Sequence, residues 1–360
     1  WRYLLHRGFE TPLHEQAVYV MLVYFVLLTL TQTFISTFNA KKETAKAYLP
    51  LLVYTVVRCV LTIFVAVYGL GVMALAYTYV FGEIFHFLIA LILIRGYPVS
   101  KPSLFYFESY VKFALPVSIA SASYIIMTNI DKVFIQLFWS AQQVGEYFAI
   151  FNLSRFMILF SNSVGLLLFP TISEYHAKDN LKEVKKITLM SERYLTMIIF
   201  PIVVIMTTLA EPIIHILLAN KYMPAIGVLQ ILPFFVLLRV LATPYSTQLS
   251  EMDMPHLDRN RVIIMAICNV FLNLILIPKD IQSLGIKLAG LGAKGAAIAT
   301  VIAYAIGLIY IRLVAWKLTD IKGNYRIIFH IIAAVITGLV LLLIKNAIFI
   351  GRWYKLLGAG

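Results

Sequence analysis

The chain has 360 residues, 61% of them hydrophobic and 13% charged, with a mean hydropathy of +0.88. This composition excludes a water-soluble globular protein and indicates a polytopic membrane protein. The formal net charge of +13 forms no basic stripe interleaved with aromatic residues, which argues against nucleic-acid binding. The excess of Lys and Arg instead suits loops that set orientation and contact anionic membrane lipid.

Hydropathy predicts about ten transmembrane helices, because a helix needs roughly 20 apolar residues to cross a bilayer. In chain order the predicted spans are residues 16–38, 49–68, 72–94, 112–138, 147–170, 193–218, 225–248, 262–278, 295–315 and 326–344. Residues 1–15 are expected to form a loop. Residues 172–192 are expected to be a basic amphipathic connector on the membrane surface.

The distribution of basic residues predicts the orientation. Alternate connections carry sixteen Lys and Arg residues on one side and nine on the other. The richer side includes the connector 172–192, and it is therefore predicted to be cytoplasmic. The turn at 140–146 is then external, and the chain is expected to be a multi-pass protein of the plasma (inner) membrane.

An internal repeat at an offset of 221 residues predicts the domain organisation. Gly69-Leu70-Gly71 recurs as Gly290-Leu291-Gly292, each before a predicted span. Spans one to three would then correspond to spans seven to nine, which predicts one complete six-helix lobe, half of another, and about three further spans in front of residue 1. The expected divisions are the first partial lobe, a cytoplasmic linker, the six-helix lobe, and an additional span with a tail, at residues 1–95, 96–111, 112–316 and 317–360.

Two long apolar segments carry charges within their apolar runs. Asp131, Lys132 and Arg155 lie on the consecutive spans four and five, where a charge costs on the order of 2.5–3.5 kcal/mol at the centre of a span. Asp131 and Arg155 fall at similar depth, so we expect them to pair. A static ion pair near the outer interface, with Lys132 extending toward water, is as good an interpretation as a role in substrate binding.

Further charges are predicted near the bilayer midplane. Arg58 and Glu83 lie about halfway along consecutive spans, and Arg239 is also deep. Such charges usually face a bundle interior or a watery cavity. Glu211 precedes Pro212 and is expected at a helix end. Asn269 and Asn273, one turn apart, are expected to form hydrogen bonds between helices.

Several short motifs resemble a known family when taken in order. They are F-A-L-P at 113–116, N-I-D-K-V-F-I at 129–135, V-G-E-Y at 144–147, L-F-P-T-I-S-E at 168–174 and G-A-A-I-A-T at 295–300. Together they resemble the polysaccharide-biosynthesis proteins and O-antigen-type flippases of the multidrug/oligosaccharidyl-lipid/polysaccharide exporter superfamily.

The resemblance implies an all-α, two-lobe exporter fold and alternating access. The implied substrate is an oligosaccharide linked to a polyprenyl pyrophosphate, carried from the cytoplasmic to the outer leaflet. Arg58, Arg239, Arg155 and Lys132 are then candidate cavity cations for the pyrophosphate, because guanidinium groups offer paired donors to phosphate. Glu83, Asp131 and Glu211 are candidates for neutralising those cations or for binding a coupling proton or sodium ion.

Two alternatives stay open. One is a cation-coupled multidrug or small-molecule antiporter of the same superfamily, and the other is a membrane enzyme or scaffold that works with other membrane proteins of polysaccharide assembly. No phosphate-binding loop of the G-x-x-x-x-G-K-[ST] type occurs, which argues against direct ATP drive. No soluble segment is long enough for an active site, and Cys59 and Cys268 fall within spans, so we expect no enzyme activity, cofactor or metal.

Overall fold

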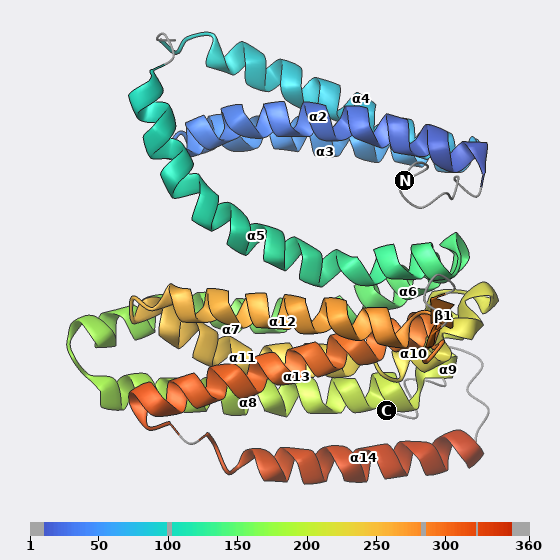
Figure 1. Ribbon diagram of the computed structural model, residues 1–360, viewed down its shortest axis with the longest axis vertical. Helices are drawn as coiled ribbons and strands as arrows, with labels where there is room; N and C mark the ends of the chain where they lie inside the picture. Colours follow the sequence, from blue (N-terminus) through green and yellow to red (C-terminus); the bar gives the residue numbers. More distant parts are fainter. Residues whose placement is uncertain (1–10, 99–102, 282–285, 322, 348–360) are drawn as a thin grey trace. The chain divides into compact units, whose positions relative to one another are not determined.

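The computed structural model describes residues 11–98, 103–281, 286–321 and 323–347, and these residues are predominantly helical (Figure 1). The chain divides into two compact units, Trp1–Leu104 and Phe105–Gly360. Seven described helices are long and apolar enough to cross a membrane, or eight if one bent pair is counted as a span. The predicted all-α membrane bundle is confirmed, whereas the count of ten spans stays a prediction.

The first unit consists of three long helices, α2 (Pro12–Ala40), α3 (Thr44–Val67) and α4 (Gly71–Ile94). Thr11 caps α2 because its side chain accepts a hydrogen bond from the backbone N–H of His14, and Pro12 occupies the first helical position. The predicted loop 1–15 is therefore wrong from residue 12 onward, and residues 1–10 lie outside the described residues. In this unit α4 packs along both α2 and α3, which touch each other only lightly.

The second unit holds the remaining elements. They are α5 (Leu104–Phe138), α6 (Ala141–Arg155), α7 (Ile158–Ala177), α8 (Leu181–Thr208), α9 (Ala210–Leu217), η1 (Asn220–Ala225), α10 (Ile226–Leu229), α11 (Pro233–Glu251), α12 (Pro255–Leu276), β1 (Asp280–Ile281), β2 (Ile286–Lys287), α13 (Gly292–Thr319) and α14 (Ile327–Ala347). The two short strands pair antiparallel. Because α5 begins at Leu104, the end of the predicted linker 96–111 is helical; its residues 99–102 lie outside the described residues.

The predicted surface connector 172–192 is mostly helix and partly buried. α7 continues to Ala177, and α8 begins at Leu181 and runs unbroken into the predicted span. Val184 is fully buried in a small core with Leu168 and Ile172 of α7. One face of this amphipathic segment is thus covered by a neighbouring helix, which the sequence pattern alone does not reveal, because buried and surface-bound amphipathic helices share the same period.

Three predicted spans are interrupted in the structure. The span 147–170 is divided between α6 and α7, and the span 193–218 breaks at Leu209, just before Pro212. The span 225–248 bends by 48° before Pro233, which begins α11 and has no backbone N–H to continue a preceding helix. The break after Arg155 contains neither Pro nor Gly, so no local signal in the sequence predicts it.

The internal repeat is also present in the backbone. Gly69, Gly71, Gly290 and Gly292 all have positive φ, at 62°, 82°, 63° and 54°. Side chains other than hydrogen are disfavoured in this region, so each tight turn requires its two glycines. Each turn leads into a helix, α4 or α13, that packs against both other helices of its triplet, α2 and α3 or α11 and α12.

Close packing of α12 on α13 gives a stability prediction at Gly295. A Cβ there would lie 2.5 Å from the Leu276 carbonyl oxygen, which belongs to the backbone and cannot rotate away. We expect Gly295→Ala to destabilise the protein by roughly 2 kcal/mol in detergent unfolding. Gly145→Ala is the matched control, because a Cβ at Gly145 meets nothing within 4 Å. Equal stability of the two variants would contradict the packing.

Candidate functional site

Asp131 lies at the centre of a buried polar cluster in the second unit. Its Oδ2 accepts hydrogen bonds from the Tyr147 hydroxyl at 2.6 Å and from the Thr300 hydroxyl at 2.8 Å. Its Oδ1 accepts one from Asn273 Nδ2 at 2.6 Å. The residues come from α5, α6, α12 and α13, so four helices meet at this carboxylate.

Two asparagines extend the cluster along α12. Asn273 Nδ2 also donates to Asn269 Oδ1 at 3.0 Å, and Asn269 Nδ2 reaches the Thr300 hydroxyl at 3.5 Å. The predicted interhelical hydrogen bonds of Asn269 and Asn273 are thus confirmed. Asn273 Oδ1 is buried and, within the described residues, accepts no hydrogen bond.

The expected ion pair between Asp131 and Arg155 is wrong. Within the described part of the chain, Asp131 forms no ion pair, and its partners are neutral groups. Arg155 is exposed at the end of α6 and lies against the Phe151 ring. Equal depth in the membrane does not imply contact. Two residues on consecutive helices meet only if each lies on the face of its helix that is turned toward the other helix.

Lys132 points away from its neighbour Asp131. Its Nζ donates to Asn129 Oδ1 at 2.8 Å and to the Thr128 carbonyl at 3.0 Å, on its own helix. It also lies 5.0 Å from the centre of the Phe151 ring. Lys132 and Asn129 thus share a polar face of α5 that does not neutralise Asp131.

The cluster has the chemistry of a site for a proton or a small hard cation. A buried carboxylate without a cationic partner is costly in its charged form, so it is stabilised by protonation or by a bound cation. Carboxylate, amide and hydroxyl oxygens are the ligands that hard cations prefer. The described residues contain no group of three or more His, Cys, Asp or Glu side chains suited to a metal ion. One carboxylate with neutral oxygens favours a monovalent ion.

Arg58 and Arg239 share a second type of environment, a cradle of tyrosine hydroxyls. In the first unit, Arg58 donates to the Tyr79 hydroxyl at 2.8 Å and to the Tyr54 hydroxyl at 3.3 Å. In the second unit, Arg239 has the side chains of two tyrosines, Tyr124 and Tyr304, as neighbours. Both arginines are partly buried, and neither forms an ion pair with a described carboxylate.

The remaining predicted acidic residues lie in different settings. Glu83 is fully buried in the first unit and contacts His86 Nδ1 at 3.0 Å, while Glu83 Oε2 and His86 Nε2 have no partner among the described residues. Glu211 is exposed in the first turn of α9, at a helix end as expected. Since it lies outside the Asp131 cluster, Glu211 is a weaker candidate for a coupling ion.

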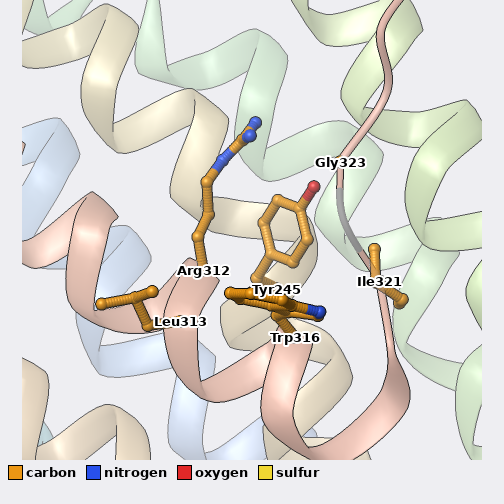
Figure 2. Close-up of a pocket in the computed structure, with 6 residues that line it drawn as sticks. All are labelled: Tyr245, Arg312, Leu313, Trp316, Ile321 and Gly323. Carbon is orange, nitrogen blue, oxygen red and sulfur yellow. The ribbon is translucent and has the colours of Figure 1, made fainter.

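A buried ion pair between Glu192 and Arg312 was not predicted from the sequence. Glu192 is fully buried on α8, pairs with Arg312 of α13, and accepts a hydrogen bond from the Tyr245 hydroxyl at 2.8 Å. Figure 2 shows Arg312 and Tyr245 side by side, pointing the same way, in a pocket of about 350 Å³. The backbone N–H of Asn324 also donates to Glu192. About one third of the Arg312 side chain is exposed, so the ion pair is buried mainly on the Glu192 side.

The family follows from a match to the model described as "Polysaccharide biosynthesis protein", over residues 2–227. The chain belongs to this family of polysaccharide biosynthesis proteins. Over 198 residues it is 24% identical to the "Probable low-salt glycan biosynthesis flippase Agl15" of Haloferax volcanii, covering 55% of this chain and 39% of that protein. The chain thus spans less than half the length of this relative. The predicted family resemblance is confirmed.

Solved structures of transporters share the fold. "Lipid II flippase MurJ, inward closed conformation" superposes with a TM-score of 0.67 at 14% identity, covering 95% of this chain and 68% of that one. A multidrug resistance MATE family transporter of the MOP superfamily, in its inward-facing conformation, gives 0.66 at 15% identity, covering 86% and 72%. At these identities the likeness concerns the fold alone, which is that of a multi-pass membrane protein.

Proposed function

We propose that the protein is part of a flippase that moves a polyprenyl-pyrophosphate-linked oligosaccharide from the cytoplasmic to the outer leaflet by alternating access. The family and the glycan biosynthesis flippase of Haloferax volcanii support a role in polysaccharide export. The lobe assignment at residues 1–95 and 112–316, which the repeated Gly-x-Gly turns support, belongs to this proposal. So does the assignment of the connector 172–192 to the cytoplasmic side.

The observation that carries the proposal is the pair of tyrosine-cradled arginines. Arg58 and Arg239 lie within apolar helices, and their described contacts leave the positive charge without a carboxylate. Phenol hydroxyls hold a guanidinium in place but do not cancel its charge, so the charge stays available to an anion. A pyrophosphate group is a suitable anion for these arginines, because guanidinium and phosphate form paired, charge-assisted hydrogen bonds.

The Asp131 cluster provides the coupling site in this scheme. Binding of a proton or a sodium ion at Asp131 neutralises the carboxylate that α5, α6, α12 and α13 share, so occupancy changes how strongly these helices hold together. Glu83 with His86 is a second candidate, on the first unit. Arg155 and Lys132, exposed or bonded to their own helix, are weaker candidates for the pyrophosphate.

A binding measurement tests the arginine role. We expect Arg239→Gln to weaken binding of a polyprenyl-pyrophosphate oligosaccharide by roughly 10- to 100-fold, because a charge-assisted hydrogen bond contributes about 1.5–3 kcal/mol. Arg259→Gln removes the same charge from an exposed position at the start of α12 and should leave the affinity unchanged. The readout is calorimetric titration of purified protein.

The same titration distinguishes the flippase from the antiporter alternative, which the structural likeness to a MATE family transporter keeps open. Tight binding of a lipophilic organic cation, lost in Asp131→Asn but insensitive to Arg239→Gln, would contradict the flippase proposal. Binding of the pyrophosphate lipid with normal affinity by Arg239→Gln would remove the arginine from the site.

A further inference from the structure

A basic pocket opens at the end of the second unit where α8 and α14 begin. It has a volume of about 440 Å³ and is lined by five cationic side chains. These are Lys182, Lys185, Lys186, Arg193 and Arg326. Of the five, Lys186 forms an ion pair with Glu183 at 3.1 Å, and Lys185 donates to the Asp320 carbonyl at 2.7 Å. Lys182, Arg193 and Arg326 have no ion-pair partner within the described residues.

An apolar groove adjoins this pocket. Its volume is about 390 Å³, and seven apolar side chains from α8, α11, α13 and α14 line it, among them Phe200, Leu308 and Ile328. Asn324 lines both the basic pocket and the groove. A cationic end and an apolar body are therefore continuous on one surface of this unit.

The Glu192 and Arg312 pair fixes the junction of the two parts. Arg312 lines the groove, and Glu192, beneath it, accepts the backbone N–H of Asn324 at 3.3 Å. Asn324 Nδ2 also donates to the Leu189 carbonyl of α8 at 3.2 Å. Since Glu192 is already paired with Arg312, it does not offset the five pocket cations, and among the described carboxylates only Glu183 pairs with one of them.

We propose that this surface binds one anionic phospholipid, with its phosphate headgroup in the basic pocket and an acyl chain in the apolar groove. Charge complementarity selects a phosphate headgroup, and the adjoining groove selects a lipid over a soluble phosphate. Three of the pocket lysines belong to the segment 172–192, which the count of basic residues predicts to be cytoplasmic. Anionic lipids are enriched in the cytoplasmic leaflet. The lipid is a bound component distinct from the transported substrate, and it holds α14 against α8 and α13.

Native mass spectrometry of the full chain in detergent tests the site with phosphatidylglycerol as the probe. The triple variant Lys182→Gln, Arg193→Gln and Arg326→Gln removes the three cations that have no ion-pair partner among the described residues, and it should weaken binding by roughly 100-fold, about fivefold for each charge removed. The matched control replaces Lys221, Lys279 and Lys287 by Gln; these exposed lysines lie in η1, directly before β1, and in β2. Figure 1 shows β1 at the opposite end of this unit from the connection between α7 and α8. The control should bind like the wild type.

The groove has its own variant. Ile328→Trp fills the groove and should weaken phosphatidylglycerol binding about tenfold while leaving binding of glycerol phosphate unchanged. Leu343→Trp, at an exposed position further along α14, is its control.

Three outcomes would overturn the proposal. The first is equal binding of phosphatidylcholine, which would remove the headgroup selectivity. The second is binding of glycerol phosphate as tightly as of phosphatidylglycerol, which would make the surface a site for soluble phosphate. The third is displacement of phosphatidylglycerol by polyprenyl phosphate at equal concentration, which would assign the surface to the substrate. None of these measurements depends on transport activity, so the result is separate from the proposed function.

Discussion

Asp131→Asn is expected to slow gradient-driven transport strongly while the protein still folds. The amide keeps the volume of the carboxylate but removes the negative charge around which four helices meet. Losing a charged ligand from a buried site costs about 2–3 kcal/mol, which corresponds to a roughly 30- to 150-fold lower rate at limiting cation concentration. The measurement is initial transport rate against sodium concentration and against pH, in proteoliposomes.

Glu146→Gln is the matched control for this variant. Glu146 is also a buried carboxylate of the second unit, but its Oε1 accepts a hydrogen bond from Gln142 at 2.9 Å and it stands outside the Asp131 cluster. We expect its cation dependence to match the wild type. If Asp131→Asn keeps the full response to both gradients, Asp131 is a structural hydrogen-bond acceptor and not the coupling site.

Glu192→Gln is expected to destabilise the protein by roughly 2–3 kcal/mol, because it leaves Arg312 buried without its charged partner. The value falls below the 3–5 kcal/mol that is typical of a fully buried pair, since one third of the Arg312 side chain is exposed and solvated. The double variant Glu192→Gln with Arg312→Gln should be less destabilised than the sum of the two single variants. Denaturant unfolding in detergent gives all four stabilities of the cycle.

An exposed ion pair on the same unit is the control for this double-mutant cycle. Glu174 and Lys178 are paired at 2.5 Å with more than 60% of each side chain exposed, so their coupling should be much weaker than that of Glu192 and Arg312. Additive effects of Glu192→Gln and Arg312→Gln would contradict a stabilising interaction between the two residues. They would also weaken the case for a fixed junction beneath Asn324.

The sequence predicts where charges lie along the helices but not which groups they contact. Asp131 is recognisable as a buried charge from hydropathy alone. Its partners Tyr147 and Thr300 are 16 and 169 residues away, and contacts at such separations depend on how the helices rotate and cross. Tyr147 and Thr300 do fall in the V-G-E-Y and G-A-A-I-A-T motifs, which was the available signal for their importance.

The amphipathic segment 172–192 was described only in part. The run that contains Val184 and Glu192 has the period of a surface helix, yet one face of it is core and holds a buried carboxylate. Hydrophobic periodicity identifies the apolar face of a helix. It does not show whether that face contacts the membrane or a neighbouring helix. The two Gly-x-Gly turns were recognisable from the sequence. Positive φ is a local backbone requirement, and glycine meets it without steric cost.

The proposed flippase function is tested by transbilayer movement of a fluorescent polyprenyl-pyrophosphate oligosaccharide in proteoliposomes, with and without an imposed sodium or proton gradient. We expect protein-dependent movement that a gradient accelerates and that Arg58→Gln, Arg239→Gln and Asp131→Asn each suppress. Gradient-driven export of an organic cation, with no movement of the pyrophosphate lipid, would contradict it.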